Sequence, residues 1–288
     1  VKVYEFSIFY NENLVTQIKL SEASSWVDIL TIKECDYTFT KKHKGFLLDQ
    51  DIKENRTVNY VPISGKYAFK KSGLGLIRRF PFIGHKNRAW YNEGYQRNYS
   101  AEIRMLDICD EDILIFSDID EIIDSRYKDE IIDMVKKNGI ITVKLHFSMF
   151  YLNLFSVNWG GPKDYSYRLF IMTGKHYKSL NMSIDELRKM GERGLLQGKV
   201  YCPDKFYGFH HSWLGDEAFI LGKLQSYCHE PHEHNSNILT NNQYDINKIK
   251  VALKNGESIF PEHLLEVSND IDMLKSIDNN KNLNKYML

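Results

Sequence analysis

Residues 112–121 read DILIFSDIDE, and the fold is best worked out from this stretch. The short apolar run 113–116, rich in β-branched residues, predicts a buried strand. Asp118, Asp120 and Glu121 follow it directly, and open α/β sheets bind their ligands at the carboxyl ends of such strands. Packing three carboxylates together is costly unless a cation or hydrogen-bond donors offset the repulsion. The stretch therefore indicates a site for a hard ion, Mg²⁺ or Mn²⁺, that also binds substrate phosphates. An ordinary acidic turn after a strand is the alternative.

The hydrophobic pattern predicts alternating strands and helices before this stretch. Strands are expected at 3–9, 27–35 and 56–63, with helices at 14–23 and 89–108. This alternation predicts a wound, largely parallel sheet flanked by helices, an α/β fold of Rossmann-like type. Further along, the expected elements are a helix at 127–137 ended by Gly139, strands at 140–154, 165–172 and 205–213, a helix opened by a capping box at Ser183, helices at 217–227 and 245–254, and a loose tail from 279.

The sequence lacks the glycine loops that usually bind phosphates in such folds. Neither GxGxxG nor GxxxxGK[ST] occurs. The sequence therefore gives poor support to a dinucleotide-binding or P-loop protein, and a fold that binds a sugar nucleotide through a metal remains.

Composition narrows the class further. The chain has 288 residues, 38 basic and 38 acidic side chains, and 43% hydrophobic residues. A neutral balance argues against a nucleic-acid binder. The four cysteines form no CxxC pair, so a zinc site is not expected. We expect a single domain over 1–288, with a nucleotide-binding half at 1–122, a half that completes the acceptor and metal sites at 123–265, and a tail at 266–288.

No apolar stretch is long enough to cross a bilayer. The richness in Asn, Lys and Ile is typical of AT-rich genomes. We therefore expect a soluble cytoplasmic protein of bacterial or viral origin, the alternative being an anchor removed ahead of Val1.

Seven blocks of the chain resemble, in order, those of glycosyltransferase family 17, the family of the β-1,4-mannosyl-glycoprotein β-1,4-N-acetylglucosaminyltransferase. They are Phe9–Leu14, Lys33–Thr40, Trp90–Asn98, Phe116–Ile122, Phe150–Gly161, Gly208–Gly215 and Lys223–His229. One departure is Ile123, which stands where the family's metal motif usually has Pro.

The resemblance implies a GT-A-like fold with its DxD motif at a strand end. It also implies a UDP-sugar donor, a divalent metal (Mn²⁺ or Mg²⁺), a glycan acceptor and inversion at the anomeric carbon. N-acetylglucosamine is the expected sugar, and xylose or another hexose stays open. Asp120 and His210 are then expected at the metal, Asp118 at the metal or the nucleotide ribose, and Glu121 at the sugar or in support of Asp120.

Other candidates follow from residue type and position. Nucleotide and diphosphate contacts are expected from Asn11, Glu34, Arg88, Gln96 and Arg97, because guanidinium forks fit phosphate and strand-end groups reach the ligand. Trp159 and Trp213 are candidates for stacking on sugar. Surface ion pairs and core packing are the plainer roles for all of these side chains.

An inverting transfer needs a general base that removes the proton of the acceptor hydroxyl. Glu217 and Glu230 are the candidates, with Asp216 and Glu233 as alternatives, since the metal motif acids are already committed.

Two other functions fit a DxD motif at a strand end. A nucleotidyltransferase acting on sugar phosphates would usually add a lysine-bearing phosphate loop, which is not found. A noncatalytic glycan-binding module would not need the three acids intact.

Overall fold

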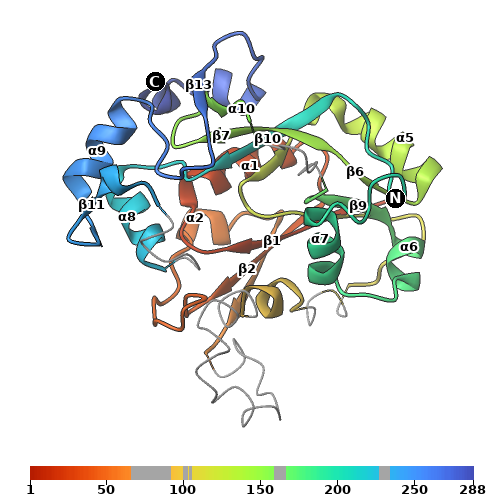
Figure 1. The fold of residues 1–288 in the computed structure, drawn as a ribbon. Helices are drawn as coiled ribbons and strands as arrows, with labels where there is room; N and C mark the ends of the chain where they lie inside the picture. Colours follow the sequence, from red (N-terminus) through yellow and green to blue (C-terminus); the bar gives the residue numbers. More distant parts are fainter. Residues whose placement is uncertain (66–91, 100–102, 104–105, 159–166, 227–233) are drawn as a thin grey trace.

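The computed structural model describes residues 1–65, 92–99, 103, 106–158, 167–226 and 234–288. In this part of the chain it shows a mixed α/β fold with two main sheets flanked by helices (Figure 1).

The first sheet is the wound sheet that the sequence predicts. Its strands, in spatial order, are β3 (Val58–Ile63), β2 (Ile29–Cys35), β1 (Val3–Phe9), β4 (Ile113–Phe116), β9 (Phe170–Thr173) and β6 (Ile140–Thr142). The first four are parallel, whereas β9 is antiparallel to both β4 and β6. Helix α1 (Asn13–Ala23) connects β1 to β2, and the short α2 (Gln50–Lys53) precedes β3.

Both faces of this sheet are covered, which explains why β4 is apolar at every position. Ile113 and Ile115 pack on one face with α1, while Leu114 and Phe116 pack on the other with residues of helix α7 (Ile184–Glu192). Successive strand residues point to opposite faces, so a strand buried on both sides needs an unbroken apolar run. The apolar run before the acids is therefore the mark of a central strand.

The second sheet begins directly after the acidic turn. Its spatial order is β13 (Leu265–Val267), β8 (Leu154–Ser156), β7 (Lys144–Met149), β10 (Phe206–Ser212) and β5 (Glu121–Ile123). The chain therefore leaves the first sheet at Phe116 and enters the second at Glu121. The intervening residues, with Asp118 and Asp120, form the link between the two sheets.

The remaining elements lie around the two sheets. They are α5 (Lys128–Asn138), α6 (Gly174–Ser179), α7 (Ile184–Glu192), α8 (Glu217–Ser226), α9 (Ile246–Lys254), α10 (Lys275–Asp278), the hairpin β11 (Leu239–Thr240) and β12 (Gln243–Tyr244), and 3₁₀ turns at Ser125–Tyr127, Ser236–Ile238 and Lys281–Tyr286. None of the helices in the described residues is long and apolar enough to cross a membrane.

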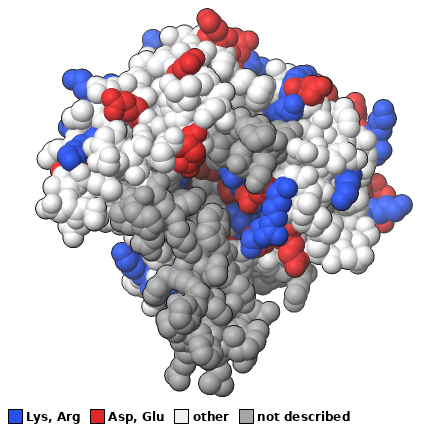
Figure 2. All heavy atoms as spheres, in the orientation of Figure 1, with Lys and Arg blue, Asp and Glu red and all other residues white. Residues whose placement is uncertain are grey.

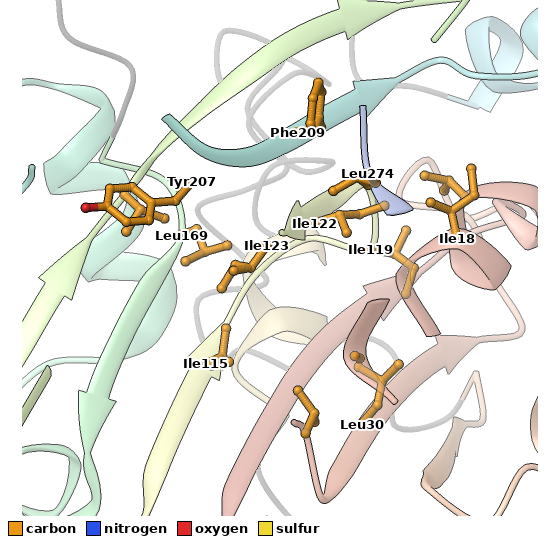
Figure 3. Close-up of a cluster of buried hydrophobic side chains, with 14 of the residues drawn as sticks. Ile18, Leu30, Ile115, Ile119, Ile122, Ile123, Leu169, Tyr207, Phe209 and Leu274 are labelled. Carbon is orange, nitrogen blue, oxygen red and sulfur yellow. The ribbon is translucent and has the colours of Figure 1, made fainter. Parts of the chain in front are cut away.

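The largest apolar core joins the two sheets through the acidic link itself. Ile119, Ile122 and Ile123 are buried in it, and Figure 3 shows them among side chains of α1, β2, β4 and β10 and near Leu274, which directly precedes α10. The apolar residues of the sequence DIDEII thus anchor the link in the core, while the acids between them are left for other roles.

Several sequence predictions are confirmed and three need correction. The capping box at Ser183 opens α7, and Gly139 ends α5 with φ of 78°. The single strand expected at 140–154 is instead divided into β6, β7 and β8, because the chain changes sheets at Val143 and adopts a left-handed conformation at Phe150.

The helix expected at 89–108 is confirmed only in part among the described residues, which are helical over 92–97 and at 103 and non-helical at 98–99 and 106–108. The prediction of a loose tail is wrong. Leu283 is buried, and Asn153 accepts the backbone N–H of Leu288 at 2.8 Å, so the tail packs on the second sheet.

Candidate active site

Hydrogen bonds within the acidic link, and others from Lys19 of α1, fix its backbone. The carboxylate of Glu121 accepts the backbone N–H of Asp118 at 2.7 Å, and the backbone N–H of Glu121 donates to the carbonyl of Asp118 at 3.1 Å. Lys19 of α1 donates to the carbonyls of Asp118 (3.2 Å) and Glu121 (2.7 Å). Lys19 is only 1% exposed and pairs with Glu5 of β1 at 2.6 Å. These contacts fix the backbone that carries the acids.

Two arginines bind the carboxylate of Asp118. Arg188 of α7 lies 2.5 Å from one oxygen, and Arg97 lies 3.1 Å from the other. Arg188 also contacts both oxygens of Glu121, at 2.9 and 3.1 Å. Burial opposes ionisation of Asp118, yet the charges of Arg188 and Arg97 hold its pKa well below the ordinary value. Asp118 is therefore an ion-paired anion in the folded protein.

Helix α7 positions Arg188 through an amphipathic pattern. Ile184, Leu187 and Gly191 lie on the buried face at helical spacing, and Arg188 lies on that same face. A buried arginine is costly unless it is paired, and the acids of the link supply its partners.

Asp120 has a different partner, His210 of β10. The Oδ1 of Asp120 lies 3.4 Å from Nε2 of His210. Strand β10 pairs antiparallel with β5 so that His210 stands opposite Glu121. Gly208 permits this approach, because a Cβ there would lie 2.0 Å from the carbonyl oxygen of Ile122. Burial opposes ionisation of Asp120, while His210 lowers its pKa.

A pocket of about 560 Å³ opens on these groups. This is an ordinary volume for a small-molecule site. Figure 2 shows acidic and basic side chains next to one another in a recess near the centre of the molecular face. The pocket has a charged lining, which we define as Glu12, Glu93, Asp118, Asp120 and Lys223, and an aromatic lining, which we define as Phe147, Trp213, Phe260 and His263.

Lys223 of α8 supplies the ammonium group of the charged lining. It lies 3.0 Å from Glu12, and its ammonium is 5.1 Å from the centre of the Trp213 ring. The other oxygen of Glu12 accepts the backbone N–H groups of Tyr10 and Asn11 at the end of β1. Burial opposes protonation of Lys223, but Glu12 and Asp120 raise its pKa, so it is a cation facing the pocket.

Glu93 is the charged-lining acid with an incomplete set of partners. Its Oε1 accepts from Arg97 at 2.8 Å. Its Oε2 is buried and has no hydrogen-bond partner among the residues that the structure describes. Burial raises the pKa of the Glu93 carboxyl, although Arg97 opposes this.

The aromatic lining comes from the second sheet and from the segment after α9. Trp213 follows β10 in the left-handed conformation, with φ of 59°, and its ring lies 5.2 Å from that of Phe260. His263 lies 5.5 Å from the ring of Phe147, and burial lowers its pKa. A left-handed non-glycine residue costs about 1–3 kcal/mol and is typical of functional sites.

The donor set of the pocket fits a hard divalent metal in part. Asp120 immediately precedes β5, His210 lies on the neighbouring strand β10, and the two present an oxygen and a nitrogen to one another. Within the described ranges, no three His, Cys, Asp or Glu side chains are close enough to hold an ion by themselves. A metal there would need ligand phosphates or water to complete its coordination, which is usual for Mg²⁺.

Some of the predicted site residues in the described ranges meet at this pocket. Asp118, Asp120, His210 and Trp213 line it. Arg97 and Glu121 lie behind Asp118 as its ion-pair and backbone partners. Gln96 is buried on the helical segment of Arg97, and its side-chain nitrogen has no partner within the described ranges.

Two candidates at strand ends serve the scaffold instead. Glu34 is fully buried and binds Lys44 at 2.9 Å and the hydroxyl of Tyr60 at 2.8 Å, so it anchors the segment that follows β2. Asn11 does not line the pocket, and its backbone N–H donates to Glu12.

Of the candidate bases, the two that the structure describes, Glu217 and Asp216, are not in the pocket lining. Glu217 begins α8 and pairs with Lys250 at 3.1 Å, and Asp216 accepts the backbone N–H of Phe219. Glu230 and Glu233 lie outside the described residues, as do Arg88 and Trp159.

Sequence patterns did not predict Arg188, Lys223 or Glu12 as site residues, nor any member of the aromatic lining except Trp213. For Arg188 a signal did exist, because a charged residue on the apolar stripe of an amphipathic helix needs a buried partner. Lys223 and Glu12 carry no such signal, since each is an ordinary polar residue of its helix until the fold brings the two together.

Comparison with known families agrees with this geometry. The sequence matches the family model described as Glycosyltransferase family 17 over residues 1–281. No curated protein matches the chain at a significant level.

Proposed function

Because the chain belongs to glycosyltransferase family 17 and is therefore a glycosyltransferase, we propose that its pocket binds a UDP-sugar with Mn²⁺ or Mg²⁺ and transfers the sugar to a glycan hydroxyl with inversion. The observation that carries the proposal is the pair of Asp120 and His210, 3.4 Å apart, in a pocket at the carboxyl ends of parallel strands. Open α/β sheets bind nucleotides at this place. In this proposal the fold is of the GT-A type and 118–120 is its DxD motif.

Asp120 and His210 would hold the metal, which would supply positive charge to the diphosphate of the departing UDP. Asp118 is better suited to an indirect role. Both of its oxygens are bound by Arg97 and Arg188, so it orients the link and is available to a ribose hydroxyl or a bound water.

Lys223 provides a second cation for the diphosphate. Its present partner, Glu12, is also satisfied by two backbone N–H groups, so Lys223 can turn toward a phosphate without leaving Glu12 unpaired. Charge-assisted contacts of this kind stabilise a leaving group most when water is excluded. The aromatic lining excludes water and offers flat apolar surfaces to sugar rings, which would favour transfer over hydrolysis.

The base of an inverting transfer must reach the acceptor hydroxyl. Glu230 is our candidate, and it follows the helix that carries Lys223. Glu217 would first have to leave Lys250. N-acetylglucosamine is the sugar we expect, with xylose or another hexose as the alternatives to be compared.

The test is a thermal-shift titration of the protein with UDP and a panel of UDP-sugars, each with Mn²⁺ and with EDTA. UDP at about 100 times its dissociation constant should stabilise the fold by about 2.7 kcal/mol in Mn²⁺ and far less in EDTA. UMP, which lacks the second phosphate, is the control and should show a weak dependence on the metal. Equal shifts by UDP in Mn²⁺ and in EDTA would contradict the proposal.

A further inference from the structure

The four acids of the charged lining, which are buried or half-buried, differ in how many hydrogen-bond and ion-pair partners the protein gives them. Glu12 binds Lys223 and two backbone N–H groups. Asp118 binds two arginines, and Asp120 faces His210. Glu93 alone among these has a buried carboxylate oxygen with no partner in the described part of the chain.

A buried oxygen without a hydrogen-bond donor lowers the stability of the folded protein. An unsatisfied buried polar atom destabilises the folded protein, and more so when it carries charge. Native proteins retain few of them, so each one calls for an explanation. Although Oε2 itself is buried, the Glu93 side chain is 15% exposed and lines the pocket, so a ligand in the pocket can supply the missing donor.

The position of Glu93 indicates which part of a ligand that would be. Arg97 joins Glu93 to Asp118, with contacts of 2.8 and 3.1 Å. Glu93 therefore stands on the Asp118 side of the pocket, where the proposed function places the sugar nucleotide. A carboxylate oxygen can only accept a hydrogen bond, and it is repelled by phosphate, so its partner must be a neutral or cationic donor. The hydroxyl groups of a sugar nucleotide meet this requirement.

We infer that Glu93 is a specificity-determining residue whose Oε2 accepts a hydrogen bond from a hydroxyl of the bound sugar nucleotide. The inference rests on the proposed function. The hydroxyl belongs either to the ribose or to the transferred sugar, and the experiment separates the two.

Arg97 offers a matched control. It binds Glu93 through Nη2 and Asp185 through Nη1, at 2.8 and 2.9 Å, but Asp185 does not line the pocket. Glu93→Gln and Asp185→Asn therefore each remove one carboxylate from the same guanidinium. If Glu93 acted only by positioning Arg97, the two variants would behave alike.

The measurement is calorimetric binding of UDP and of the preferred UDP-sugar, in Mn²⁺, to the wild type and both variants. We expect Glu93→Gln to weaken binding about tenfold or more, the usual worth of a hydrogen bond to a charged group, and Asp185→Asn to leave it unchanged. Weakening that is already present with UDP assigns the hydroxyl to the ribose. Weakening that is confined to the UDP-sugar assigns it to the transferred sugar.

Equal losses in the two variants, or no loss in either, would overturn the inference. A second measurement needs no variant, because wild-type binding of deoxy analogues must show one hydroxyl whose removal costs about tenfold. If no hydroxyl behaves in this way, Glu93 has no ligand partner. Failure of the proposed function would look different, since the wild type would then not bind UDP in a metal-dependent way.

Discussion

The charged lining and the aromatic lining face the same pocket, but the protein holds them by different means. Asp118 lies between two arginines on a backbone held by buried Lys19. The aromatic lining is held by ring packing, as between Trp213 and Phe260. Ion pairs fix direction as well as distance, whereas apolar packing tolerates small shifts. The charged lining should therefore respond sharply to single substitutions, and the aromatic lining gradually.

Substitutions in the charged lining and in the aromatic lining should also lower stability for different reasons. Removing one partner of a buried ion pair leaves a charge with no compensation, so the loss exceeds what the pair contributed. Trimming an aromatic side chain removes contact area in proportion to its size. Three substitutions test this contrast, taken from the largest expected effect to the smallest.

Asp120→Asn should have the largest effect, on activity rather than on stability. The change keeps the shape of the side chain and removes the charge proposed to hold the metal beside His210. Since a catalytic metal supplies several kcal/mol, transfer should fall about a thousandfold or more. The transfer rate and the metal dependence of the UDP thermal shift should be lost together.

The control for this variant is Asp204→Asn, because Asp204 pairs with Lys144 at the surface. It should keep full activity. An Asp120→Asn protein that is folded and active would remove Asp120 from the metal site.

Arg188→Met should have the next largest effect, on stability. Asp118 and Glu121 both lose a partner, and Glu121 is fully buried. Breaking a buried pair in this way costs about 3–5 kcal/mol of unfolding free energy, which urea denaturation measures. Arg193→Met, at an exposed position just after the same helix, should change the stability by less than about 0.5 kcal/mol.

The pH dependence sharpens this prediction. The folded-state pKa of Asp118 is lowered, so its contribution to stability is present above the ordinary pKa of Asp and disappears as the pH falls through the folded value. The stability difference between wild type and Arg188→Met should therefore narrow below about pH 4. A difference that stays constant down to pH 2 would show that lost packing, and not lost charge, explains the effect.

Phe260→Leu should have the smallest effect. Phe260 packs on Trp213 and lies 5.0 Å from His234, and a leucine keeps most of the apolar contact. We expect a stability loss of about 1–2 kcal/mol and transfer weakened about two- to tenfold, with metal-dependent UDP binding unchanged. Phe206→Leu, at a half-exposed site outside the pocket lining, is the matched control. If Phe260→Leu abolished transfer, the aromatic lining would be as sensitive to single substitutions as the charged lining.

Much of the fold was predictable because its signals are local. The apolar run of β4, the helix α1 between two strands, the capping box of α7 and the glycine after α5 each depend on a few adjacent residues. The predictions that failed depended on distant contacts. Nothing near residue 143 marks the change of sheet, and the packing of Leu288 on Asn153 joins segments 135 residues apart.

The candidate site divides in the same way. Asp118 and Asp120 were identifiable because the acids follow directly on a buried strand. Glu34 also lies at the end of a strand, yet its carboxylate accepts hydrogen bonds from Lys44, Tyr60 and two backbone N–H groups. A strand-end acid in the sequence is therefore a candidate, and the groups that approach its carboxylate decide its role.

The order of residues alone determined the wound sheet, the acidic link at the end of its central strand and the family, because strand periodicity and a short run of acids are properties of neighbouring residues. Tertiary structure decided how those acids are used. It brought Arg188 to Asp118 across 70 residues and His210 to Asp120 through the pairing of β10 with β5. Electrostatic energy depends on distances in space and on burial, and neither quantity can be read from positions along the chain.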